Sequence, residues 1–64
     1  MKNFKVGDRV RIISNESESD NPIFSVGIIS FITYNDCRVV VKGHTDNNTC
    51  NWSHFDELEL VEVE

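Results

Sequence analysis

Gly7-Asp8-Arg9-Val10-Arg11-Ile12-Ile13 is the stretch that decides the fold of this 64-residue chain. After the Gly-Asp turn signal, charged and aliphatic side chains alternate with a period of two, as in a β-strand that has one buried face. The alternation predicts a strand over residues 8–14 that points its two arginines outward and buries Val10 and Ile12.

Two later stretches extend the predicted sheet. Val26-Gly27-Ile28-Ile29-Ser30-Phe31-Ile32 is rich in β-branched residues and predicts a strand over residues 26–34. Its apolar residues do not alternate, so we expect a β-bulge near Ser30 that lets both ends face the core, with Phe31 in that core. After an Asn-Asp turn, a third strand is expected to point its odd-numbered side chains inward, and these are Cys37, Val39 and Val41.

The remaining segments predict loops and two short strands. Residues 15–25 contain three carboxylates and the single proline, which predicts a solvated loop that is long for a chain of this size. Residues 49–53 predict a fourth strand with Trp52 and Cys50 in the core, and residues 54–57 predict one 3₁₀ turn. A fifth strand is expected from Leu58, Leu60 and either Val61 or Val63. Together these elements predict a single all-β domain over residues 1–64, a five-stranded barrel with a 3₁₀ turn before the last strand.

Composition and charge narrow the class of protein. Hydrophobic residues make up 39% of the chain, which is enough to form a core. Eleven acidic residues against six basic ones give a formal charge of −5, which opposes binding to a polyanion because phosphate contacts dominate nucleic-acid affinity. No apolar run resembles a signal peptide or a membrane span, so we expect a cytoplasmic location, no membrane partner and two free thiols.

The strand stretches resemble the SH3-like barrels, in particular their KOW branch, which is found in large-subunit ribosomal proteins and transcription elongation factors. The resemblance rests on the first two quoted stretches and on Arg38-Val39-Val40-Val41-Lys42-Gly43. The chain from Trp52 to Leu60 is similar to the ending of small bacterial and phage SH3-like proteins of unassigned role. The resemblance covers nearly the whole chain and implies a barrel that acts as a non-catalytic binding domain, since this fold hosts unrelated binding roles.

Catalytic and metal sites are not expected. The potential metal ligands are Cys37, His44, Asp46, Cys50 and His54. A structural zinc site usually has two closely spaced ligand pairs, and this chain has neither a second cysteine pair nor a pair of closely spaced histidines. Both cysteines are expected to be small core residues, and no glycine-rich phosphate loop is present. We therefore expect no enzyme activity and no cofactor.

Protein binding is the favoured function. We expect a groove between the long loop and the 3₁₀ turn, where aromatic anchors and acidic side chains would meet a basic partner protein of unknown identity. The candidate residues are Phe24, Tyr34, Phe55, Glu16, Glu18 and Asp20. The size of the chain suits a small regulatory or phage-encoded protein.

The alternative is a KOW-like nucleic-acid or ribosome-associated domain that uses a basic strand face. Its candidate residues are Arg9, Arg11, Arg38 and Lys42. The same side chains could simply keep the domain soluble and pair with Glu59 or Glu62, and the acidic, glycine-free loop after the first strand argues against RNA binding. A third interpretation, an acidic mimic of nucleic acid, requires carboxylates spread over one face.

Overall fold

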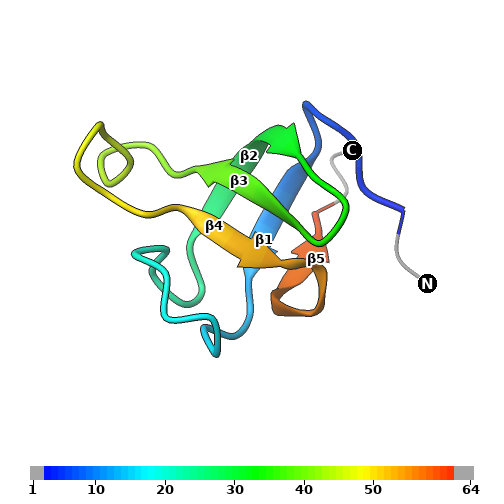
Figure 1. Cartoon of the computed structure of the whole chain (residues 1–64), viewed down its shortest axis with the longest axis horizontal. Coiled ribbons are helices and arrows are strands. Elements are labelled where there is room, and N and C mark those ends of the chain that lie inside the picture. The colour runs from blue at the N-terminus through cyan, green and yellow to red at the C-terminus, as the bar shows by residue number, and fades with distance from the viewer. Residues whose placement is uncertain (1–2, 62–64) are drawn as a thin grey trace.

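The computed structural model describes residues 3–61, which form one five-stranded antiparallel sheet (Figure 1). The strands are β1 (Arg9–Ile12), β2 (Val26–Ile32), β3 (Asp36–Val40), β4 (Trp52–His54) and β5 (Leu58–Leu60), and the 3₁₀ helix η1 (Phe55–Glu57) precedes β5. Their order across the sheet is β4-β3-β2-β1-β5. The predicted all-β class with five strands and a 3₁₀ turn is confirmed, whereas closure into a barrel stays a prediction.

Strand ends differ from the sequence prediction by a few residues. β1 ends at residue 12 rather than 14 and β2 at 32 rather than 34, while the fourth strand starts at 52 rather than 49. The predicted roles of Val63 and Glu62 lie outside the described residues. Within the described part of the chain, no helix is long and apolar enough to cross a membrane.

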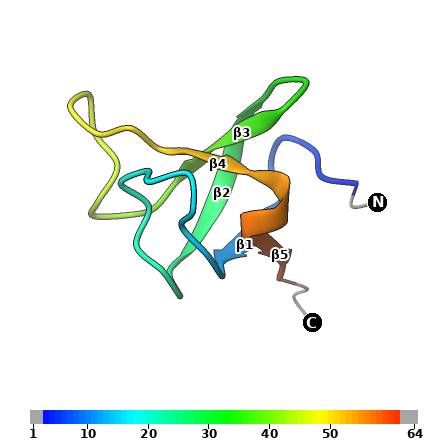
Figure 2. The same ribbon diagram turned by 60° about the horizontal axis from the view of Figure 1, so that its bottom comes forward.

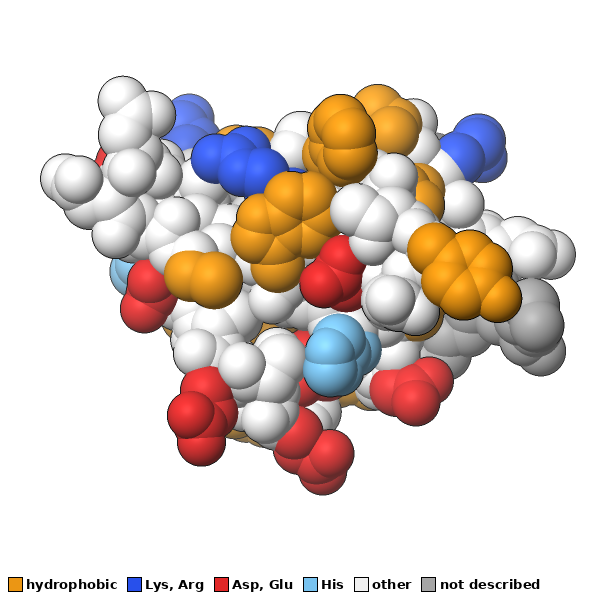
Figure 3. Space-filling model, viewed as in Figure 1, with side chains coloured by type: hydrophobic (Ala, Val, Ile, Leu, Met, Phe, Trp, Pro, Cys, Tyr) orange, Lys and Arg blue, Asp and Glu red, His pale blue; other side chains and the backbone are white. Residues whose placement is uncertain are grey.

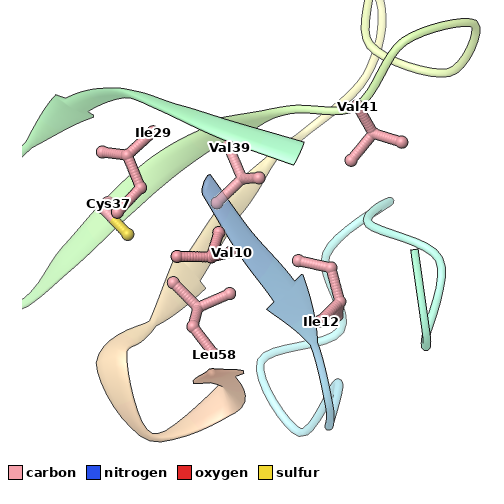
Figure 4. Packing of buried hydrophobic residues seen from close by; sticks show 7 residues of the cluster. All are labelled: Val10, Ile12, Ile29, Cys37, Val39, Val41 and Leu58. Atoms are coloured by element: carbon pink, nitrogen blue, oxygen red, sulfur yellow. The ribbon is translucent and has the colours of Figure 1, made fainter. Parts of the chain in front are cut away.

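The core is one cluster of seven buried hydrophobic residues. Its members are Val10, Ile12, Ile29, Cys37, Val39, Val41 and Leu58. They come from β1, β2, β3, β5 and the segment after β3, because the sheet curls and directs the inner side of each strand at the same space (Figure 4). The inward alternation predicted for the first and third strands is confirmed. Burial of each such aliphatic side chain stabilises the fold by about 1.5–3 kcal/mol.

A β-bulge in β2 decides which of its side chains reach the core. The register with β3 shifts between Ile29 and Phe31, so the bulge predicted near Ser30 is confirmed. The predicted core position of Phe31 is wrong, because the extra residue in the bulge turns Phe31 outward, where its side chain is 57% exposed. The same shift turns Ile32 toward the core, against which it packs.

Gly27 allows β2 to lie close to the strand beside it. A Cβ atom at this position would lie 2.6 Å from both Val39 Cγ1 and the backbone oxygen of Val40. Contacts this short force a shift of the backbone, so close packing between β2 and β3 depends on the missing side chain.

The predicted orientation of the fourth strand is wrong. Trp52 is half-buried on the outward side and Cys50 is exposed, whereas Asn51 and Ser53 point inward and are buried. Hydrogen bonds make these polar positions acceptable in the interior. The Asn21 amide nitrogen donates to Asn51 O (3.1 Å) and Ser53 Oγ (2.6 Å), and the Asn51 amide nitrogen donates to Asn21 Oδ1 (2.9 Å).

The long segment between β1 and β2 is ordered against the rest of the domain. Figure 2 shows it beside the chain that leads into β4. Asp20 N donates to Cys50 O (2.7 Å), and Cys50 N donates to Asp20 Oδ2 (2.7 Å). Ser19 and Asn21 are buried, so the segment predicted as a solvated loop covers part of the interior instead.

Candidate binding surface

The side of the sheet that points away from the core carries a continuous set of exposed and half-exposed side chains, and we call it the outer face. Strand register places its residues in three transverse rows: Glu59, Arg11 and Val26; Arg9, Ile28 and Val40; and Phe31, Arg38 and Trp52. β2 is the middle strand of the sheet, and its outward positions are apolar except for Ser30, which lies in the bulge. The outer face therefore has a hydrophobic strip along its centre.

Two aromatic rings lie in contact at one end of this strip. Phe31 on β2 and Trp52 on β4 meet with ring centroids 5.9 Å apart and an interplanar angle of 71°, the edge-to-face geometry that aromatic pairs favour. Arg38 lies between them in register, so the rings meet across the strand that carries it. This position explains why Arg38 is half-buried, and its Nη1 donates to Ser30 Oγ at 3.3 Å.

Basic side chains flank the strip on both sides. Arg9 and Arg11 lie on β1, and Arg38 lies on β3. Lys42 is exposed two residues beyond Val40, past the end of β3. The structure therefore brings Arg9, Arg11 and Arg38 to the two borders of one apolar strip, whereas Lys42 lies in the turn after β3. In the view of Figure 3, blue basic side chains lie beside orange hydrophobic ones in the upper half, and most red acidic ones lie lower.

Within the described residues, no ion pair joins these basic side chains to a carboxylate. Arg11 faces Glu59 across the β1–β5 pair, but the one ion pair in the described part of the chain joins Lys5 Nζ to Asp8 Oδ1 at 3.3 Å. Arg9 lies opposite Ile28, and Arg38 lies opposite Phe31 and Trp52. Arg9 and Arg38 thus have apolar cross-strand neighbours instead of carboxylates.

The aromatic residues predicted to bind a protein do not form one site. Phe24 and Tyr34 lie beyond opposite ends of the seven-residue β2. At about 3.3 Å per residue, this strand keeps them roughly 20 Å apart. Phe55 is half-buried and stacks on Phe4, with ring centroids 6.0 Å apart. Glu16, Glu18 and Asp20 are all exposed on the ordered segment between β1 and β2.

Phe24 has an unusual backbone conformation. Its φ is +75° and its side chain is 76% exposed. Ser25 N donates to Pro22 O (3.2 Å), so Phe24 occupies the third position of a tight turn, where a positive φ favours glycine. Ile23 beside it is also exposed, so this turn presents two large apolar side chains at the end of β2.

An open, polar pocket lies at the other end of the sheet. It has a volume of about 510 Å³, and its lining residues are Asn35, Asp36, His54, Phe55 and Asp56. Tyr34, next to this pocket in the chain, is 96% exposed. The described residues bring no three side chains of His, Cys, Asp or Glu together in a way that could hold a metal ion.

Glu57 is a buried acid that the sequence did not single out. Its Oε2 accepts a hydrogen bond from Ser17 N (2.6 Å), and its Oε1 accepts from Ser17 Oγ (2.7 Å) and His54 N (2.9 Å). Burial raises the pKa of this carboxyl, but the hydrogen bonds from Ser17 and His54 outweigh burial and hold the pKa below its ordinary value. Glu57 fastens the segment after β1 to η1, and the serines of that segment are the only hint of this in the sequence.

The two thiols are free and have different environments. Burial, helped by the negative charge of Asp36, raises the pKa of Cys37 to about 11. Cys37 is therefore the core residue that was predicted, whereas Cys50 is exposed and the prediction for it is wrong.

No family model matches the chain, and no curated protein or solved structure matches it either. The outer face and the two ends of the sheet therefore have to be interpreted from their own chemistry.

Proposed function

We propose that this domain is a non-catalytic binding module and that the outer face of its sheet binds a protein partner. The observation that carries the proposal is the apolar strip on β2, between strands that carry arginines. Soluble domains rarely expose large contiguous patches of apolar side chains, and where such patches occur they often mark interaction sites. Tryptophan and arginine, which both lie on this face, are also among the residues that dominate binding energy in protein interfaces.

The SH3-like assignment, with its KOW-like branch, is a proposal of the same kind. It is supported by the curled five-stranded sheet, by the bulge in β2 and by the 3₁₀ turn before the last strand. A cytoplasmic location is also proposed, and the two free thiols support a reducing compartment.

Selection from a displayed library of random peptides tests the binding proposal. The immobilised domain should enrich peptides whose binding is lost in the double variant Ile28→Ser, Phe31→Ser, because both side chains are exposed on the outer face and neither fills the core. Val6→Ser, which removes an exposed apolar side chain outside the sheet, is the control and should retain the peptides. Failure to enrich any peptide, or equal binding to the double variant, would overturn the proposal.

Nucleic-acid binding is the second candidate, because Arg9, Arg11 and Arg38 border the same strip that holds the Phe31–Trp52 pair, and Lys42 is exposed in the turn after β3. Aromatic rings beside arginines can stack bases and contact phosphates. An electrophoretic shift with single-stranded RNA and duplex DNA at low and moderate salt tests it. Salt-sensitive binding that Arg9→Ala weakens would support this candidate, and no shift at low salt would remove it.

A further inference from the structure

We propose that the outer face receives an amphipathic α-helix of a partner protein, with an apolar stripe against β2 and carboxylates along both of its flanks. This inference rests on the proposed function and goes further, because it specifies the shape and charge of the partner.

The length of the apolar strip fits a short helix. Val26, Ile28 and Phe31 are its outward apolar residues on β2, with the exposed Ser30 between the last two, and the first and last are five residues apart along the strand. At about 3.3 Å per residue, the strip is roughly 17 Å long. A helix rises about 1.5 Å per residue, so roughly eleven residues, or three turns, cover it.

The width of the strip also fits a helix. β1 and β3 lie on either side of β2 at about 4.8 Å each, so the backbones of these two strands are roughly 10 Å apart. This is close to the diameter of a helix with its side chains, about 10–12 Å. A stripe of apolar residues at positions i, i+3, i+4 and i+7 would lie on Ile28 and its neighbours, and the flanks of the helix would lie over β1 and β3.

The basic side chains on both borders of the apolar strip indicate that the flanks of the partner's helix carry acidic residues. Arg9 and Arg11 border the strip on the β1 side, Arg38 borders it on the β3 side, and Lys42 is exposed in the turn after β3. Carboxylates on a helix resting on β2 would face these cations from both sides, and arginine pairs with carboxylates through two parallel hydrogen bonds. Glu59 competes for Arg11 but is not opposite the other three.

Other occupants fit the face less well. A second copy of this chain packed face to face about a two-fold axis would bring arginines against arginines. An added β-strand needs a free sheet edge, and β2 is the middle strand. Nucleic acid gains little from Val26, Ile28 and Val40, because aliphatic side chains do not offer the flat ring on which bases stack, and the net charge of −5 repels it.

The test uses two synthetic 18-residue helical peptides with the same leucine stripe, one with glutamates on both flanks and one with lysines there. Trp52 is the single tryptophan of the chain and lies on the outer face, so its fluorescence reports binding directly. We expect the glutamate peptide to bind at least tenfold more tightly than the lysine peptide. The charge reversal Arg9→Glu, Arg38→Glu should invert this preference, and Val6→Ser, an exposed change outside the sheet, should leave it unchanged.

Equal affinity for the two peptides, a preference that survives the charge reversal, or tighter binding of a single-stranded oligouridine probe would each overturn the helix proposal. Circular dichroism of each variant confirms that it remains folded, and the substituted side chains are outside the core. The two proposals fail separately. If library peptides bind the outer face but are neither acidic nor helical, the binding module stands and the helix proposal falls. If no library peptide depends on Ile28 and Phe31, the binding module itself falls.

Discussion

Glu57 is only 3% exposed, and its carboxylate accepts hydrogen bonds from two different segments of the chain. A charge held in this way stabilises the fold only while it remains ionised. Because its pKa is lower in the folded chain than the ordinary 4.5, its contribution is fully present above about that pH and is lost as the pH falls through the lowered value.

Glu57→Gln tests this pH dependence. At pH 7 we expect the variant to lose roughly 1.5–3 kcal/mol of unfolding free energy, as for other hydrogen bonds to charged groups. At pH 3 the difference from the wild type should shrink, because pH 3 lies below the ordinary pKa of 4.5, where the unfolded chain takes up a proton at Glu57 more readily than the folded chain does. Urea unfolding followed by Trp52 fluorescence at both pH values measures it, and an equal difference at both would contradict the expectation.

The thiols provide a second test at the residue scale. Cys50 is exposed, whereas Cys37 is buried and has a pKa near 11, so only Cys50 should react with iodoacetamide in the folded domain at pH 7.5. Intact mass spectrometry should show one modification per chain without denaturant and two in urea. Rapid double modification of the folded domain would place Cys37 outside the core.

Strands differed in how well the sequence predicted them. β1 and β3 bury aliphatic side chains and expose charged ones on alternate positions, so their inner side could be predicted from polarity alone. β4 could not, because it buries Asn51 and Ser53 and turns Trp52 outward. Partners for these polar groups come from Asn21, about thirty positions away in the chain, and no local pattern reveals such a contact.

Because β4 turns Trp52 outward, we expect the loss of its side chain to cost less unfolding free energy than the loss of the buried Leu58 side chain. Trp52 is half-buried on the outer face, so Trp52→Ala should cost about 1–2 kcal/mol, less than the loss of a core side chain. Leu58 is fully buried, and Leu58→Ala should cost about 2–5 kcal/mol. Thermal unfolding followed by circular dichroism compares them. A larger loss at Trp52 than at Leu58 would show that the tryptophan fills the core.

At the scale of the whole molecule, the interior has an apolar part and a polar part. The hydrophobic cluster lies within the curled sheet, and the hydrogen-bonded side chains of Asn21, Asn51 and Ser53 join the segment after β1 to β4. In a domain of 64 residues the hydrophobic core is small, so the polar part has to add to its stability.

Asn21→Ala tests the polar part. The change leaves Asn51 Nδ2 and Ser53 Oγ without a buried partner, so we expect a loss of about 2–3 kcal/mol. A loss of 1 kcal/mol lowers Tm by about 4–8 °C in a domain this small, so the shift is easily measured. Glu16→Ala, an exposed change in the same segment, is the control and should move Tm little. Equal shifts would mean that the network adds nothing.

The candidate surface could be predicted only in part. Strand parity correctly pointed Arg9, Arg11 and Arg38 outward, because charged side chains on a half-buried strand avoid the core. Parity does not reveal that β2 lies between β1 and β3, since this depends on strand pairing. Nor does it reveal the outward turn of Phe31, which follows from the bulge. The apolar strip is therefore a property of the assembled sheet.

The hydrogen bonds between Ser17 and Glu57 also bear on how fast the chain folds. They join residues 40 positions apart, so they form only after the chain has closed a loop of that size. Closing such a loop has an entropic cost, which favours late formation of contacts between distant residues. Bonds that form late are largely absent from the folding transition state. Such bonds lower the unfolding rate and have little effect on the folding rate. We therefore expect Glu57→Gln to raise the unfolding rate more than it lowers the folding rate, which stopped-flow measurements in urea would show.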